Sequence, residues 1–144
     1  TDSGKARFIA SVLPADLLPE AVRSSGQKHD LVLQSLRSHD QYNTTIYGMD
    51  DRYRGVYKAR RIVLMNPVDM ENESIEPSEE IDLVSKFSGI ERYAERWKVV
   101  PYSIPRGNIA TYFPEANVLI PLDSVADSSN TPTSKSVVVN IIKR

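Results

Sequence analysis

The chain has 144 residues, the size of one domain with a single core. Eighteen basic residues nearly balance nineteen acidic ones, so the net charge of −1 creates no overall field that would attract nucleic acid or an anionic membrane. The absence of cysteine excludes disulfides, thiolate metal sites and a cysteine nucleophile within these residues. No apolar run approaches the roughly 20 residues that cross a bilayer, and no signal peptide is recognisable. We therefore expect a soluble, cytoplasmic protein.

The hydrophobic pattern predicts several short strands and few helices. Apolar or alternating runs that are typical of strands occupy residues 8–13, 31–36, 61–65, 81–87, 97–100 and 136–142. Asn66 and Pro67 provide a cap residue and a first-turn proline for a short helix over Val68–Glu73. Residues 15–23 could form a helical turn or two. These elements favour a small β-barrel or sandwich with helical insertions.

Three polar stretches without clear periodicity are candidates for function, because a rigid scaffold usually presents its binding residues on loops. They cover residues 36–61, 101–122 and 127–136. In the first stretch, Arg37 and Gln41 would offer both hydrogen-bond donors and acceptors to a polar ligand. By composition alone, an ordered turn with internal hydrogen bonds is the more common explanation of such a stretch.

A basic and aromatic run is a second candidate. Five positive charges fall within ten residues and are interleaved with two tyrosines. The run consists of Arg52, Tyr53, Arg54, Tyr57, Lys58, Arg60 and Arg61. Such a combination can bind phosphates or stacked bases, but Asp50 and Asp51 neutralise part of its charge and no nucleic-acid recognition motif accompanies it. A non-catalytic β-barrel module that binds protein or nucleic acid is therefore one functional hypothesis.

Familiar catalytic and nucleotide-binding motifs are missing from the sequence. Ser38, His39 and Asp40 have the residue types of a hydrolase triad, but neighbours on an extended backbone point to opposite faces. The only two histidines, His29 and His39, do not have the spacing of a helical zinc site. There is no glycine-rich dinucleotide fingerprint, no phosphate-binding loop with Gly-Lys-Ser/Thr, and no Gly-Ser bond at which a pyruvoyl enzyme could cleave itself.

An ordered series of short motifs is more informative than any one of them. The motifs are RSHDQYNTT at 37–45, DRYRG at 51–55, MNPVD at 65–69, IPRG at 104–107, YFPEANVLIPL at 112–122 and SNTPTSKS at 129–136. From about Leu31 to Ile142, this order resembles the C-terminal molybdopterin-guanine-dinucleotide-binding domain of formate-dehydrogenase-like alpha subunits in the dimethyl-sulfoxide-reductase family. Gln-Tyr-Asn-Thr and Phe-Pro-Glu-Ala-Asn are the more specific parts. The chain departs from the family at residues 77–80, where Pro-Ser-Glu-Glu replaces a common Gly-Asp turn.

The resemblance implies both a fold and a function. The fold would be mainly β with short helices, a double-psi β-barrel of the aspartate-decarboxylase-like type, formed by residues 1–144 as the C-terminal part of a larger subunit. The cofactor would be bis-molybdopterin guanine dinucleotide with molybdenum or tungsten, held mainly by the preceding domains. The intact subunit would be an oxidoreductase, with formate as the substrate suggested by analogy, and this domain alone would be inactive.

The resemblance also implies the partners and the residues at the cofactor. The partners would be the other domains of the parent subunit, a small redox substrate and an electron-transfer subunit, with no nucleic acid and no membrane segment. Arg37 would pair with phosphate or pterin oxygens through its planar guanidinium group, and Asn117 would hydrogen-bond the cofactor. No catalytic residue and no metal ligand is expected. The full set of expected cofactor contacts is Arg37, Ser38, His39, Gln41, Asn43, Thr44, Arg106, Gly107, Asn117 and Lys135.

Overall fold

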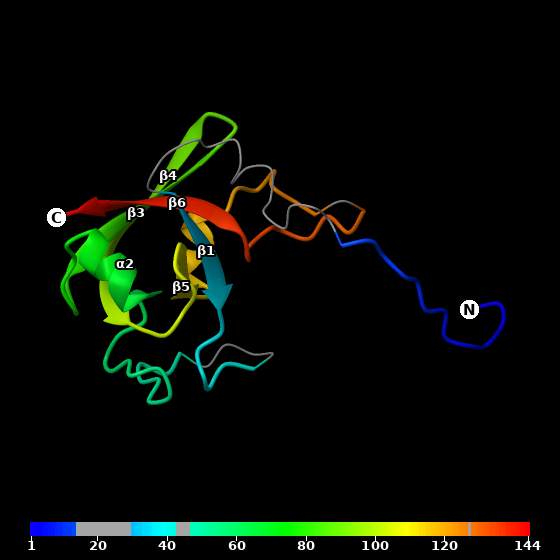
Figure 1. Cartoon of the computed structure of the whole chain (residues 1–144), viewed down its shortest axis with the longest axis horizontal. Coiled ribbons are helices and arrows are strands. Elements are labelled where there is room, and N and C mark those ends of the chain that lie inside the picture. The colour runs from blue at the N-terminus through cyan, green and yellow to red at the C-terminus, as the bar shows by residue number, and fades with distance from the viewer. Residues whose placement is uncertain (14–29, 43–46, 127) are drawn as a thin grey trace.

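The computed structural model describes residues 1–13, 30–42, 47–126 and 128–144. Six strands in these ranges close into a barrel in the order β1-β5-β2-β4-β3-β6 (Figure 1). The strands are β1 (Leu31–Leu36), β2 (Ile62–Met65), β3 (Glu80–Phe87), β4 (Ile90–Pro101), β5 (Asn108–Tyr112) and β6 (Val137–Lys143). The helices within the same ranges are α2 (Pro67–Asn72) and a 3₁₀-helix, η1 (Glu115–Leu119). The expected class, a mainly β closed barrel with short helices, is confirmed.

Most of the predicted elements are present, with three differences. β4 begins at Ile90 and is therefore longer than the predicted run at 97–100. β5 lies inside the stretch 101–122, which the sequence analysis treated as polar and irregular; four of its five residues are buried, so no alternation marks it. The strand predicted at residues 8–13 was wrong: this segment pairs with no strand in the described part of the chain, and its large apolar side chains are 77–95% exposed. The turns suggested at 15–23 lie outside the described residues.

Two parallel strand pairs decide which loops meet. β1 and β5 run parallel from the pair Val32–Asn108 to the pair Leu36–Tyr112, and β2 and β4 are parallel as well. Because parallel strands end at the same edge, the segments that follow β1 and β5 start side by side; the Phe113 N–H donates to the Leu36 carbonyl at 2.7 Å. β6 is antiparallel to β1, so the segment before β6 reaches the same edge. We call this edge, where β1 and β5 end and β6 begins, the loop end of the barrel.

The core has two parts because β2 is buried on both faces. Val63 and Met65 face the main core with Trp97, which is 1% exposed. Successive side chains of a strand alternate, so Ile62 and Leu64 face the other way, into a smaller cluster. That cluster also contains Val56, Ala110 and Tyr112. The loop before β2 is therefore packed onto the barrel, although its sequence is polar.

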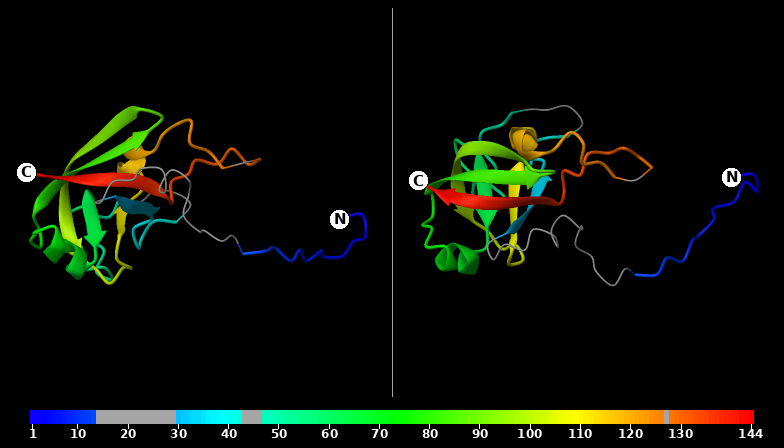
Figure 2. Two further views of the ribbon diagram at one scale, coloured as in Figure 1. Left: turned by 45° about the horizontal axis from the view of Figure 1, so that its top comes forward. Right: turned by 90° about the horizontal axis from the view of Figure 1, so that it is seen from above.

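The helix predicted after β2 is confirmed together with its cap. The Asn66 side chain accepts a hydrogen bond from the Val68 N–H at 2.9 Å and donates one to the Ile104 carbonyl at 2.7 Å, and Pro67 occupies the first turn. In the following turn, where the resembled family commonly has Gly-Asp, Ser78 takes a left-handed conformation with φ of 71°. The turn is thus formed without glycine. Residues 1–13 extend away from the barrel in every view (Figure 2).

Candidate functional site

Several of the residues expected at the cofactor lie at the loop end. Arg37, Ser38 and His39 follow β1 directly, and Asn117 belongs to η1, which follows β5. Lys135 stands just before β6, and its Nζ donates to the Ser35 carbonyl of β1. Gln41 is buried in the same segment as Arg37, whereas Asn43 and Thr44 lie outside the described residues.

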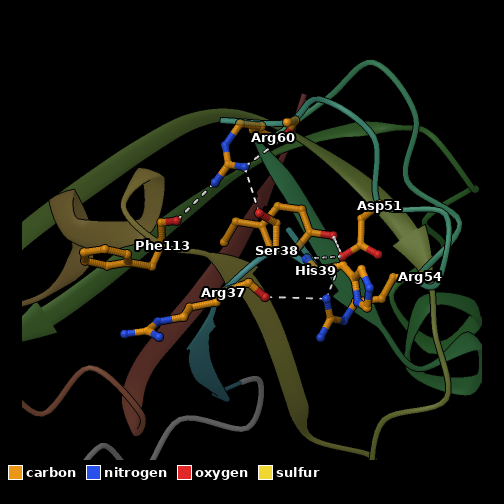
Figure 3. Close-up of polar contacts among 9 residues, drawn as sticks. Arg37, Ser38, His39, Asp51, Arg54, Arg60 and Phe113 are labelled. Carbon is orange, nitrogen blue, oxygen red and sulfur yellow. Dashed lines mark hydrogen bonds and ion pairs between the residues drawn. The ribbon is translucent and has the colours of Figure 1, made fainter. Parts of the chain in front are cut away.

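The Arg37 and Asn117 side chains are available to a ligand. Both residues are exposed, and neither side chain makes a hydrogen bond or an ion pair with another residue in the described ranges. Figure 3 shows the Arg37 side chain directed away from the polar network beside it. A planar guanidinium group and an amide group at one end of a barrel suit a ligand with phosphate and carbonyl oxygens. The residues present therefore fit a pterin dinucleotide.

Arg106 and Gly107 lie at the opposite end of the β1/β5 pair, and the structure does not bring them together with the other candidates. Tyr112 follows Gly107 by five residues, which is about 16 Å along a strand. The Asp69 carboxylate accepts hydrogen bonds from Arg106 Nε at 3.0 Å and from the Gly107 N–H at 2.7 Å. Gly107 has φ of 74°, a conformation that glycine adopts without strain. Their observed contacts hold the turn before β5.

A buried arginine that the sequence analysis did not single out joins the segments at the loop end. Arg60 is 6% exposed and donates to Ser38 Oγ at 3.0 Å, the Gly48 carbonyl at 3.1 Å and the Phe113 carbonyl at 3.1 Å (Figure 3). It also pairs with the Glu115 carboxylate at 2.5 and 3.2 Å. In the sequence, Arg60 was only one charge of a basic run. No local signal distinguished it from Arg61, because its partner Glu115 lies 55 residues away in the sequence.

A second polar network centres on Asp51, which is 2% exposed. Its Oδ2 accepts hydrogen bonds from the Tyr112 hydroxyl at 2.8 Å, from Arg54 at 2.6 Å and from the His39 N–H at 3.2 Å. Burial raises the pKa of Asp51, but the hydrogen bonds from Tyr112 and Arg54, the charge of Arg54 and the His39 N–H outweigh it, so the pKa lies below its usual value. Burial and the bond to Asp51 raise the pKa of Tyr112. The backbone at His39 is therefore fixed. The His39 ring lies against the Tyr53 ring in a tilted arrangement, with the two centroids 3.8 Å apart.

The basic run does not form one continuous positive face. Arg60 is buried against Glu115, and Arg54 pairs with Asp51 at 2.6 Å. Arg52 lies over the Tyr53 ring, 5.0 Å from its centroid. The structure therefore does not favour the nucleic-acid hypothesis.

The described ranges contain no group of three or more histidine, aspartate or glutamate residues placed to hold a metal ion. Nor does any helix in these ranges have the length and apolar character needed to cross a membrane.

Comparison with known proteins shows the family to which this chain belongs. Residues 31–138 match the molydopterin dinucleotide binding domain, and the chain therefore belongs to that family. It is 48% identical over 146 residues to the uncharacterized oxidoreductase Rv2900c of Mycobacterium tuberculosis (strain ATCC 25618 / H37Rv). It is 40% identical over 144 residues to protein YdeP of Escherichia coli (strain K12). Each alignment covers 98% of this chain but 18% of the relative, so the chain spans under a fifth of these relatives' length.

Proposed function

We propose that this chain, as a single domain over residues 1–144, binds part of a bis-molybdopterin guanine dinucleotide that carries molybdenum or tungsten. It would do so as the C-terminal domain of a larger oxidoreductase. The proposal is supported by the family match over residues 31–138 and by relatives that are several times longer and named oxidoreductase. The observation that carries it is the pair of unengaged polar side chains, Arg37 and Asn117, at one end of the barrel.

Each residue at the loop end would have a distinct part in binding. The Arg37 guanidinium would form paired hydrogen bonds to phosphate or pterin oxygens, and the Asn117 amide would offer a donor and an acceptor to the pterin. Lys135 would add a positive charge beside them. Ser38 is buried against Arg60 and would act mainly through the position of its backbone. His39 and Gln41 belong to the same segment and would complete its contacts.

Four of the expected contacts remain predictions from the resemblance alone. Asn43 and Thr44 continue the segment that begins at Arg37, outside the described residues. Arg106 and Gly107 stand at the other end of β5, where Asp69 binds both. They would reach the cofactor only through a part of it distant from the Arg37 contact.

The division of labour in the intact protein follows from the chemistry of the cofactor. When bound, the metal and its pterin dithiolenes supply the redox chemistry. The residues of this chain bind, orient and shield the ligand, so the isolated chain would have no activity of its own. Formate as substrate is part of the proposal and rests on the formate-dehydrogenase-like motif series. The other domains of the parent and an electron-transfer subunit are the proposed partners.

The test uses the intact polypeptide that contains this chain. Molybdenum, tungsten and acid-released guanine nucleotide are measured per polypeptide in wild type and in the Arg37→Ala, Asn117→Ala and Arg61→Ala variants. Wild type should carry metal with guanine nucleotide, and the first two variants should lose most of both while remaining folded. Arg61→Ala is the matched control, because Arg61 is exposed and donates only at 3.5 Å to the Glu95 carbonyl. A wild-type protein with neither metal nor guanine nucleotide would overturn the proposal.

A further inference from the structure

One buried side chain joins the two segments that carry Arg37 and Asn117. Arg60 lies just before β2, 22 residues after Ser38 in sequence and 53 residues before Phe113. Its guanidinium carbon is 5.2 Å from the ring centroid of Tyr47 and 5.5 Å from that of Tyr112. Two aromatic rings therefore pack around the charge, and the polar contacts of the group lie among the surrounding loops.

All five N–H groups of Arg60 are used. Nε donates to Glu115, one terminal nitrogen donates to Ser38 and Gly48, and the other donates to Phe113 and Glu115. A buried guanidinium needs such complete hydrogen bonding, because an unpaired donor away from water is strongly destabilising. Lysine could not replace it, since an ammonium group has three donors and no planar fork. The site is therefore built for arginine.

The partners of Arg60 stand next to the proposed ligand contacts. Ser38 is the neighbour of Arg37, and Glu115 begins the η1 helix in which Asn117 lies. Figure 3 shows the contacts of Arg60 with Ser38, in the segment after β1, and with Phe113, in the segment after β5. Because both segments bond to the same rigid group, their relative position depends on it.

We propose that Arg60, paired with Glu115, is a positioning residue that holds Arg37 and Asn117 at the separation required to bind one cofactor together. This inference rests on the proposed function and deepens it. Arg60 does not touch the ligand, because it is buried and all of its donors are used. The hydrogen-bond partners of Arg60 all lie outside the strands, so loosening the pair should affect the loop end more than the strands.

The experiment compares two variants with a matched control in the intact polypeptide. Arg60→Lys keeps the charge and loses the fork, whereas Glu115→Gln leaves Arg60 in place and removes its ion pair. Arg61→Lys is the control, since Arg61 is the exposed neighbour of Arg60 and its side chain makes one contact, at 3.5 Å to the Glu95 carbonyl. Amide hydrogen exchange is followed in residues 36–42 and 113–119, which report on the two segments, and in residues 62–65 and 80–87, which report on the strands. Guanine nucleotide per polypeptide is measured in the same preparations.

Exchange should rise by about tenfold or more in both loop-end segments of Arg60→Lys and Glu115→Gln, because each loses hydrogen bonds to a charged group. Exchange in the strands and in the Arg61→Lys control should stay near wild type. Bound guanine nucleotide should fall several-fold in the two variants, although no proposed ligand contact has been removed.

Three results would overturn the inference. One is unchanged exchange in either loop-end segment, and a second is an equal rise in the strands, which would indicate a general stabilising role. The third is faster exchange in both segments with full nucleotide content. If wild type itself carried no guanine nucleotide, the proposed function would fail, while the exchange comparison would still decide whether Arg60 couples the two segments. If Arg60→Lys did not fold, Glu115→Gln would decide the same question.

Discussion

The Tyr112 hydroxyl donates a 2.8 Å hydrogen bond to the Asp51 carboxylate, and this contact connects the end of β5 to a loop 61 residues earlier in the chain. The same carboxylate oxygen accepts from the His39 N–H, directly after β1. The other oxygen of Asp51 is buried and has no hydrogen-bond partner in the part of the chain that the structure describes. Asp51 thus connects three segments at the loop end. Its negative charge is stabilised by three donors, all bound to one carboxylate oxygen.

The Tyr112→Phe variant should be less stable by about 1–3 kcal/mol, because the buried Asp51 loses a donor that supports its charge. The pKa of Asp51 should rise at the same time. Urea unfolding at neutral pH measures the stability difference. Tyr93→Phe removes a comparable hydroxyl, bound to Glu91 at 2.6 Å on an exposed hairpin, and should change stability little. Equal effects of the two variants would contradict the role given to Tyr112.

The contribution of Asp51 to stability should depend on pH in a defined direction. Its pKa is lower in the folded state than the ordinary value of about 3.9. The stabilisation is therefore present above that ordinary value and is lost as the pH falls through the folded-state pKa. We expect wild type to exceed Asp51→Asn in unfolding free energy by about 2–4 kcal/mol at pH 7, with the gap narrowing progressively below about pH 4. Urea unfolding from pH 7 to pH 3 measures the gap, and a constant gap would contradict the prediction.

Arg106→Ala and Arg37→Ala should differ in their effect on the cofactor. Arg106 is largely exposed and contacts Asp69, which still binds the Gly107 N–H when the arginine is removed. The Arg106→Ala protein should therefore keep more of its guanine nucleotide than the Arg37→Ala protein, which loses a contact at the loop end. Nucleotide release from the intact polypeptide measures both. Equal loss would instead place Arg106 in contact with the cofactor, as the resemblance implies.

Ser78→Gly should stabilise the chain by about 0.5–1 kcal/mol, because Ser78 has φ of 71° and glycine adopts this conformation without steric strain. Thermal unfolding measures the change. Ser103→Gly is the control: Ser103 is exposed and has no positive φ, so glycine there should slightly lower stability by increasing the freedom of the unfolded chain. A destabilised Ser78→Gly variant would contradict the strain argument.

The candidate site could be predicted only in part, because its residues differ in what fixes them. Arg37 and Asn117 were proposed from the order of motifs, and the barrel places both at the loop end. Arg60 could not be distinguished from Arg61, since both are arginines at the end of one basic run. The difference arises from Glu115, 55 residues away in the sequence, which pairs with Arg60 and lets it be buried.

The sequence by itself determined the strands at 31–36, 61–65, 81–87 and 136–142 and the capped helix after Asn66, because hydrophobic period and cap chemistry are properties of neighbouring residues. Only the tertiary structure decided that residues 108–112 form a strand, because they are held by pairing with β1 and β2 on either side. It also decided that Arg106 stands apart from Arg37 and that Arg60 is buried. Strand pairing and the burial of a charge depend on partners far away in the chain, and no local pattern encodes them.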